Sequence, residues 1–321
     1  METTTEIPTE DSPVVIDVVN TTIYVTIAVV GLLWNSILII IFVRHREIWT
    51  TGNAMIFNLA ICDILNLIIG VPLLSLYGFP HSAPNHMTFC RIRLVLRHWM
   101  TGASALSVVG LSFQRFCITV SWFKTRKYKK STVTAVIILL VWIAAFVIAL
   151  PFAFVREFYG HMCGLDTDDY GTKVFVVVYG CYYGVFLPSL VCFFSVVVAV
   201  RLRKSTKILR GDVRSGMEEV LRKRSANVVA ALAVVFVVTF CPYWVFCAFG
   251  TFLRVDLSNA SVVVISNLAK QLQFANSCFN PIALYLASRT FRYLFKRYFL
   301  CCSRDTEVAI GSCETSCTNS G

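Results

Sequence analysis

Charged side chains are scarce in this sequence. Only 15% of its 321 residues are Asp, Glu, Lys or Arg, whereas 57% are hydrophobic, and the mean hydropathy is +0.70. A soluble globular domain carries about 25% charged residues. A soluble protein of this length could not hide so much apolar surface, so we expect lipid to be the surrounding solvent.

Catalytic and metal-binding motifs are absent as well. The sequence has no Walker phosphate loop, no Gly-x-Ser-x-Gly and no His-Glu-x-x-His pattern, and its 5 histidines are scattered without zinc-like spacing. We therefore expect no enzyme. The first 20 residues are polar and acidic and do not resemble a cleavable signal peptide. We expect the first apolar helix to act as its own insertion signal.

Apolar runs long enough to cross a bilayer, about 20 residues each, recur along the chain. Backbone amides in lipid must be satisfied within their own segment, so these runs predict helices. The predicted spans are residues 22–43, 54–78, 90–120, 132–155, 174–200, 226–253 and 262–287. The fold class is thus all-α, a seven-transmembrane helix bundle over residues 22–287, between a tail at 1–21 and a segment at 288–321. A transporter is the rival class, but it would tend to show internal repeats, and none is visible.

Basic residues gather in alternate connections between these spans. They lie at residues 44–53, 121–131 and 201–225 and after residue 288, whereas the N-terminal tail holds five acids and no base. The positive-inside rule then predicts an extracellular N-terminus and a cytoplasmic C-terminus, in a multi-pass protein of the plasma membrane. The net charge of +11 therefore reports topology and does not indicate nucleic-acid binding.

Two kinds of modification agree with this orientation. The sequons at Asn20 and Asn259 fall in segments assigned to the outside, where glycosylation takes place. Cys90 begins the third span and Cys163 lies in the loop after the fourth, both on the oxidising side. We expect these two cysteines to form a disulfide that ties the loop to the third helix.

Apolar and basic residues alternate at helical spacing after Ser288. This pattern predicts a short C-terminal amphipathic interfacial helix, with its apolar face in the inner leaflet and its basic face toward anionic lipid. A soluble amphipathic helix is the alternative. Cys301 and Cys302 follow it and are candidates for S-acylation. The apolar positions are Phe291, Leu294, Phe295, Tyr298 and Phe299, and the basic ones are Arg289, Arg292, Lys296 and Arg297.

Several polar side chains lie inside apolar spans, where charge is expensive. Asp63 is in the middle of the second span, Asn35 is in the first, and Asn276, Ser277 and Asn280 are in the seventh. They form either a polar cluster that holds helices together or a hydrated ion and switch site, because a carboxylate at that depth needs a cation or a proton. We expect no cofactor, apart from a sodium ion near Asp63.

These features in this order resemble the rhodopsin-type (class A) G-protein-coupled receptors over nearly the whole chain. The closing "NSCFNPIALYLASRTFRYLFKRY" is particularly similar to the peptide-receptor branch that holds the bombesin, endothelin and insect CCHamide receptors. The resemblance implies an extracellular peptide ligand, a heterotrimeric G protein and arrestin as partners. It depends on Asn35, on "NLAICD" with Asp63, on Cys90 and Arg115 in the third span, on Trp142 and Pro188, on "FCPYW" with Pro242, and on "NSCFNP".

The resemblance also assigns an activation switch at the inner end of the third helix. By resemblance, Arg115 is the arginine of the family's Asp-Arg-Tyr motif, which an acid holds in the resting receptor. Here Gln114 replaces the acid and Phe116 the tyrosine, with Glu218 and Glu219 as alternative acidic partners. We therefore predict a resting state that is held less tightly than in typical relatives. Further residues implied in the switch are Asp63, Phe240, Pro242, Asn276, Asn280 and Pro281.

Other departures from the family leave the direction of this effect open. Phe240 stands where an activation-linked Trp is common, Val196 where the fifth helix often has Tyr, and Leu284 at the tyrosine position after Asn-Pro, with Tyr285 following. A receptor that couples weakly or signals without ligand is therefore an alternative.

Cationic side chains occupy the outer half of the predicted bundle, where a ligand would enter. Arg93 and Arg97 are four positions apart and share a helix face, next to His98, and Lys270 lies near Gln273. An anionic group on a peptide or on a non-peptide ligand would suit these cations, and an amine is disfavoured because monoamine receptors carry Asp at the Arg97 position. Alternatively, acids of the outer loop neutralise them, namely Glu157, Asp166, Asp168 and Asp169.

Overall fold

The structure, a computed structural model, is helical throughout the residues that it describes. These are residues 12–75, 87–119, 130–154, 169–208, 213–253, 255 and 259–299. Seven long helical segments and one short helix account for nearly all of this part of the chain, and it contains no strand. The expected all-α class is confirmed.

The helical segments follow the order of the predicted spans. The first is α1 (Ser12–Arg44), and the second combines α2 (Thr51–Leu65), η2 (Asn66–Gly70) and α3 (Val71–Ser75). The third is α4 (Met87–Thr119), and the fourth is α5 (Lys130–Ala149) with η4 (Leu150–Ala153). The fifth combines α6 (Tyr170–Cys181), η5 (Tyr182–Phe186) and α7 (Leu187–Ile208). The last three are α8 (Val213–Phe252), α9 (Ala260–Ala287) and α10 (Arg289–Phe299), and η1 (Arg46–Ile48) connects α1 to α2.

Two helices begin earlier than the apolar runs indicate. α1 begins at Ser12 instead of residue 22, and α8 begins at Val213 instead of residue 226. Hydrophobicity marks only the part of a helix that lies in lipid, and a helix can continue into water beyond that part. The apolar runs therefore predicted the presence of these helices better than their ends.

Six of the long segments among the described residues are apolar enough to cross a membrane by length and composition. The seventh, α9, falls short because it carries Lys270, Gln271 and several Asn and Ser residues. Most of these polar residues face the interior, where Gln271, Asn276 and Asn280 are buried. α9 is therefore polar on the side that faces the other helices.

Local chemistry explains where several helices begin and bend. The hydroxyl of Thr50 accepts a hydrogen bond from the Asn53 amide and caps α2, and the carboxylate of Asp169 caps α6 in the same way. The π-helical turns η2 and η5 come just before Pro72 and Pro188. A proline lacks an N–H donor, so a wider turn beside it leaves the helix bent but continuous.

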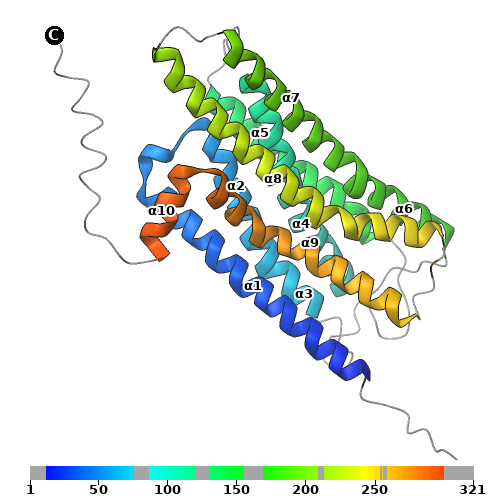
Figure 1. Cartoon of the computed structure of the whole chain (residues 1–321). Helices are drawn as coiled ribbons and strands as arrows, with labels where there is room; N and C mark the ends of the chain where they lie inside the picture. Colours follow the sequence, from blue (N-terminus) through cyan, green and yellow to red (C-terminus); the bar gives the residue numbers. More distant parts are fainter. Residues whose placement is uncertain are drawn as a thin grey trace, which may run out of the picture.

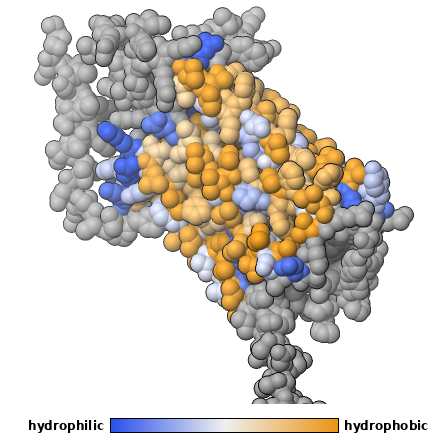
Figure 2. All heavy atoms as spheres, turned by 45° about the vertical axis from the view of Figure 1, so that its right-hand side comes forward, coloured by the Kyte–Doolittle hydropathy of each residue, from blue (hydrophilic) through white to orange (hydrophobic). Residues whose placement is uncertain are grey.

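The helices run side by side as a bundle with α4 at its centre (Figure 1). α4 packs against α2, α5, α7 and α8, and α9 packs against α1 and α8. Figure 2 shows a broad hydrophobic surface on the face in view, with hydrophilic residues mainly toward the ends. Large apolar side chains such as Leu33, Leu139 and Ile143 are more than half exposed. This surface suits lipid, so the chain is a multi-pass membrane protein.

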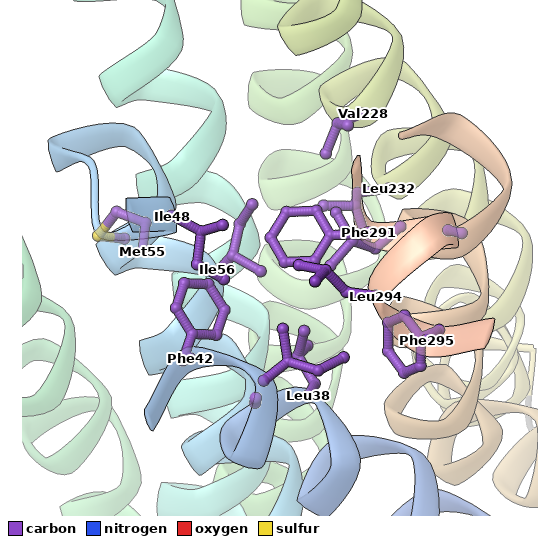
Figure 3. Close-up of a cluster of buried hydrophobic side chains, with 14 of the residues drawn as sticks. Leu38, Phe42, Ile48, Met55, Ile56, Val228, Leu232, Phe291, Leu294 and Phe295 are labelled. Atoms are coloured by element: carbon purple, nitrogen blue, oxygen red, sulfur yellow. The ribbon is translucent and has the colours of Figure 1, made fainter. Parts of the chain in front are cut away.

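α10 turns back across the end of the bundle, which corrects one expectation. Phe291, Leu294 and Phe295 are buried, and they pack with Leu38 and Phe42 of α1 in a cluster that also includes α2 and α8 residues (Figure 3). We expected this apolar face to lie in the lipid. Instead the bundle itself buries these three residues, because the ends of α1, α2 and α8 leave an apolar surface for them to cover.

Candidate functional site

Asp63 lies at the polar centre of the bundle and is fully buried. Its Oδ1 accepts hydrogen bonds from Ser104 Oγ of α4 at 2.6 Å and from Ser277 Oγ of α9 at 3.0 Å. Its Oδ2 accepts a third from Asn280 Nδ2 of α9 at 2.8 Å. One carboxylate therefore joins three helices.

A small cavity lies beside this carboxylate. It has room for about one water molecule and is lined by Asn35, Asp63 and Asn280 among apolar residues of α1, α2, α8 and α9. The side-chain oxygens of Asn35 and Asn280 are buried without a hydrogen-bond partner among the described residues. Oxygen atoms of this kind bind hard cations or water. The residues present therefore fit a small cation, although no cluster of His, Cys, Asp and Glu with metal-site geometry occurs in the described part of the chain.

Hydrogen bonds extend from this centre toward the outer half and to neighbouring helices. Asn66 Nδ2 donates to Ser277 Oγ at 3.4 Å, and Asn66 Oδ1 accepts from Thr101 of α4 at 3.0 Å. Asn35 Nδ2 donates to the Ser277 carbonyl at 2.8 Å, which joins α1 to α9. Asn276 accepts from Thr239 at 3.0 Å, which joins α9 to α8. The expected cluster at Asn35, Asp63, Asn276, Ser277 and Asn280 thus forms one connected region.

Arg115 lies near the inner end of α4 and contacts the start of α2. Its Nη2 donates to the Gly52 carbonyl at 3.1 Å and lies 3.4 Å from Asn53 Oδ1. No acidic residue pairs with it among the described side chains, where the only ion pair joins His45 to Glu47. Glu218 and Glu219, the alternative partners, have no described side chains. The guanidinium is therefore held by two neutral oxygens.

Gln114 and Phe116 point to other helices. Gln114 is buried and its Nε2 donates to Thr134 Oγ1 of α5 at 2.6 Å. Phe116 packs against Phe194 of α7, with 5.3 Å between the ring centroids. The three residues at the family's Asp-Arg-Tyr positions thus contact α5, α2 and α7 in turn.

The remaining residues predicted to take part in the switch lie along α8 and α9. Phe240 is buried and stacks on Phe236, with 4.8 Å between the ring centroids. Pro242 and Pro281 lie inside α8 and α9. Leu284 is buried and lines the cavity beside Asp63. Tyr285 instead packs against Trp34 of α1 and lies under the guanidinium of Arg292.

Two cationic side chains lie in the outer half, Arg97 on α4 and Lys270 on α9. Lys270 is about one helical turn before Phe274, the residue that Arg97 contacts. The guanidinium of Arg97 lies 6.0 Å from the ring centroid of Phe274, which also packs edge-on against Tyr24. Neither cation has an acidic partner among the described residues. Two like charges in a medium of low dielectric constant favour binding of an anion between them.

His98 points away from this pair, into an aromatic cluster. Its ring stacks on Phe152 with 3.6 Å between centroids and meets the edge of Tyr179. Its Nδ1 donates to the Leu94 carbonyl at 2.8 Å. Trp244 of α8 completes the cluster. His98 is therefore packed and hydrogen-bonded, and a direct ligand contact stays a prediction.

The other candidate binding residues occupy different surroundings. Arg93 is buried near the start of α4, and Gln273 is buried near the middle of α9. Gln271, which neighbours Lys270, donates to Asn20 Oδ1 of α1 at 2.8 Å. Asn20 lies within the candidate span Val18–Arg44, and this position supports a structural role for its side chain. Glycosylation there stays a prediction.

Several of the expected modification sites lie outside the described residues. Cys90 is disulfide-bonded, whereas its expected partner Cys163 lies outside the described residues, as do Cys301 and Cys302. Asn259 is exposed and caps α9 by accepting from the Ser261 amide. Of the loop acids, Asp169 caps α6 through Thr172, and Glu157, Asp166 and Asp168 lie outside the described residues.

Sequence reasoning missed the residues that surround Arg115 and Asp63. Gly52, Asn53 and Thr134 had no motif or charge to mark them, and their role depends on helices that are far apart in sequence. Ser104 carried a weak signal, since it lies three turns before Arg115 on the same helix. A search for polar residues in the third span would have found it.

Comparison with known proteins finds one receptor family and several receptors as relatives. Residues 34–285 match the family model of the 7 transmembrane receptors of the rhodopsin family. The chain is 28% identical to the neuropeptide CCHamide-1 receptor of Drosophila melanogaster, over 87% of this chain and 60% of that receptor. It is 26% identical to the endothelin-1 receptor of Homo sapiens, over 88% of this chain and 72% of that one. It is 28% identical to the somatostatin receptor type 1 of Rattus norvegicus, over 88% and 71%. The chain thus spans 60% of the length of the CCHamide-1 receptor.

Proposed function

Because the chain belongs to the rhodopsin family of 7 transmembrane receptors, we propose that it binds an extracellular peptide and activates a heterotrimeric G protein. The family is one of signalling receptors and not of enzymes. The resemblance to the endothelin and CCHamide receptors, inferred from the end of the seventh span, agrees with the relatives found.

The observation that carries the proposal is the pair of cations in the outer half. Arg97 and Lys270 come from different helices, Arg97 lies over the ring of Phe274 about one helical turn from Lys270, and neither cation has an acidic partner among the described residues. A bound carboxylate would interact with both, and Coulomb attraction at about 4 Å is several-fold stronger there than in water. We therefore propose that the ligand presents an acidic group to Arg97 and Lys270.

A peptide suits this region better than a small anion alone. The relatives are named as receptors for peptides such as CCHamide-1 and endothelin-1. The aromatic cluster around His98, Tyr179 and Trp244 is formed by α4, α6 and α8, and His98 follows Arg97 directly on α4. Aromatic surface of this kind binds apolar or amide groups, so a chain with an acid and an apolar side chain would contact both regions. An anionic non-peptide ligand would use the cations only.

The signal would pass through the polar centre to the inner end of α4. The network from Thr101 through Asn66 and Ser277 to Asp63 links the outer half to the centre. We propose that the receptor lies in the plasma membrane with its N-terminus outside, so that Arg115 faces the G protein and arrestin. We also propose that Asp63, with the side-chain oxygens of Asn35 and Asn280, holds a sodium ion in the resting state.

The test uses cells that express the chain and a neuropeptide library, in which each peptide is present with a free and with an amidated C-terminus. We expect at least one peptide to bind in a guanine-nucleotide-sensitive manner. Arg97→Glu should abolish this binding at normal surface expression. Arg91→Glu makes the same charge change at an exposed position of the same helix and should leave binding intact.

Other outcomes would contradict the proposal. Unchanged affinity in Arg97→Glu would remove the role of the cation pair. Substrate flux into vesicles, with no nucleotide-sensitive binding, would indicate a transporter instead. Strong signalling without any peptide, unaffected by the library, would indicate a constitutively active receptor.

A further inference from the structure

Gly52, at the start of α2, creates the space that the guanidinium of Arg115 occupies. A Cβ atom added at Gly52 would lie 2.4 Å from Nη1, 2.7 Å from Cζ and 2.9 Å from Nη2 of Arg115. All three nearest atoms belong to that one flexible side chain. Any residue larger than glycine would therefore displace the guanidinium while leaving the backbone of α2 in place.

Asn53 is oriented to complete the same site. Its Nδ2 donates to the Ile48 carbonyl at 2.9 Å, so its Oδ1 is the end that faces Arg115. Thr50 fixes the first turn of α2 by accepting from the Asn53 amide at 3.3 Å. The connection between α1 and α2 thus holds two oxygens, the Gly52 carbonyl and Asn53 Oδ1, toward the guanidinium.

The electrostatics of this site make the hold weak. Neutral oxygens give weaker hydrogen bonds to a cation than a carboxylate does. The start of a helix also carries a partial positive charge, which disfavours a cation by about 0.3–1 kcal/mol. Among the described residues, Arg115 is therefore held by the shape of the site and by two hydrogen bonds, without an ion pair.

We propose that Gly52 and Asn53 are positioning residues that hold Arg115 in the resting state, in place of the acid that Gln114 has replaced. This inference rests on the proposed receptor function. Gln114 is turned to Thr134, so α2 takes over the restraint that the neighbouring residue would supply. Displacing the guanidinium frees it for the G protein and raises signalling without ligand.

The functional test uses purified receptor in lipid nanodiscs, without ligand, and measures nucleotide exchange on a panel of heterotrimeric G proteins. Gly52→Ala should raise the exchange rate about five- to thirty-fold, the effect of one or two lost hydrogen bonds. Gly250→Ala is the matched control, because it makes the same change in a helix where nothing lies within 4 Å of the added atom. It should leave the rate unchanged. An unchanged or lower rate in Gly52→Ala would overturn the inference.

A second measurement needs no G protein and separates the two proposals. Backbone hydrogen exchange of residues 48–54 is compared between the wild type and Arg115→Met. Exchange in this segment should become faster in the variant, because its carbonyl and amide partners lose the guanidinium. If no receptor variant drives nucleotide exchange on a G protein, the proposed receptor function is wrong, but faster hydrogen exchange at residues 48–54 in Arg115→Met still supports the contact between α2 and Arg115. Equal hydrogen exchange in the wild type and Arg115→Met overturns the proposed role of Gly52 and Asn53.

Discussion

Gln114 stands where the resemblance places the acid of the family's Asp-Arg-Tyr motif. It is buried, and its amide donates to Thr134 of α5. An amide can make hydrogen bonds but supplies no charge to Arg115. The absence of an acid at this position lowers the cost of moving Arg115, and the contacts with Gly52 and Asn53 set how much restraint is left.

Restoring a charge at position 114 should quieten the receptor. In Gln114→Glu the carboxylate has nearly the size of the amide, and the Thr134 hydroxyl can donate to it. An ion pair of about 1–2 kcal/mol with Arg115 would lower the active fraction roughly five- to thirty-fold. The measurement is ligand-free nucleotide exchange. Thr134→Val, which removes the same contact without adding charge, should not produce the decrease, and a decrease of equal size in both variants would count against charge as the cause.

Asp63 is the shared hydrogen-bond acceptor of three buried donors. In Asp63→Leu, the donors on Ser104, Ser277 and Asn280 lose their shared acceptor inside the bundle, and stability should fall by about 3 kcal/mol or more. Asp63→Asn should cost much less, because Asn280 can turn its side-chain oxygen, which has no described partner, toward the new amide. Thermal unfolding in detergent measures both. Equal losses would show that the charge itself is what stabilises the centre.

At the scale of elements, α10 is a packed part of the bundle. Arg292 donates to the Tyr285 carbonyl at 3.2 Å and also to the Leu286 carbonyl. It thereby satisfies two carbonyls at the end of α9, which a helix end leaves without partners. Tyr298 lies beside His45 at the end of α1. α10 is thus anchored at its start by α9 and near its end by α1.

Removing one buried ring of α10 should test this packing. Phe295 is fully buried, whereas Tyr293 on the same helix is 37% exposed. Phe295→Ala should lower stability by about 3 kcal/mol through lost contacts and a cavity, and Tyr293→Ala should change it by less than about 0.5 kcal/mol. Thermal unfolding measures the difference. If Tyr293→Ala costs as much as Phe295→Ala, the apolar face of α10 belongs in lipid after all.

Sequence patterns predicted the elements well because their signals are local. A run of apolar residues predicts a span, and alternating apolar and basic residues predict α10, without knowledge of any neighbour. The surface that α10 would cover was not predictable in this way, because it is formed by α1, α2 and α8 together. The early start of α1 at Ser12 was missed because hydropathy reports the lipid-facing part of a helix only.

The candidate site also contains residues that the sequence predicted and residues that it did not. Asp63, Asn280 and Arg115 stand out because charged and amide groups are costly in lipid, and their spacing resembles the family's. The partners of Arg115 do not stand out, since Gly52 acts through an absent side chain and Asn53 resembles any surface residue in sequence. Only the position of α2 against α4 shows what they contact.

At the scale of the whole molecule, the bundle joins an outer region, where Arg97 and Lys270 have no acidic partner among the described residues, to an inner region where two neutral oxygens hold Arg115. The polar network through Asp63 lies between them and connects four helices. Asp63 hydrogen-bonds to α4 and to α9, the two helices that carry the outer cations. This arrangement serves signalling only if the two regions face opposite sides of the membrane.

The orientation that the charges predict can be measured directly. The segments 121–131 and 201–225 are rich in basic residues, which are costly to carry across the bilayer. The N-terminal tail is acidic and holds no basic residue that would keep it in the cytoplasm. An epitope tag at the N-terminus should therefore bind antibody on intact cells. A tag at the C-terminus should bind only after permeabilisation, and a tag inserted in the 201–225 connection is the matched internal control, expected to behave like the C-terminal one. If both termini were labelled on intact cells, an even number of spans would follow, and Arg115 could not face a G protein while Arg97 faces a peptide.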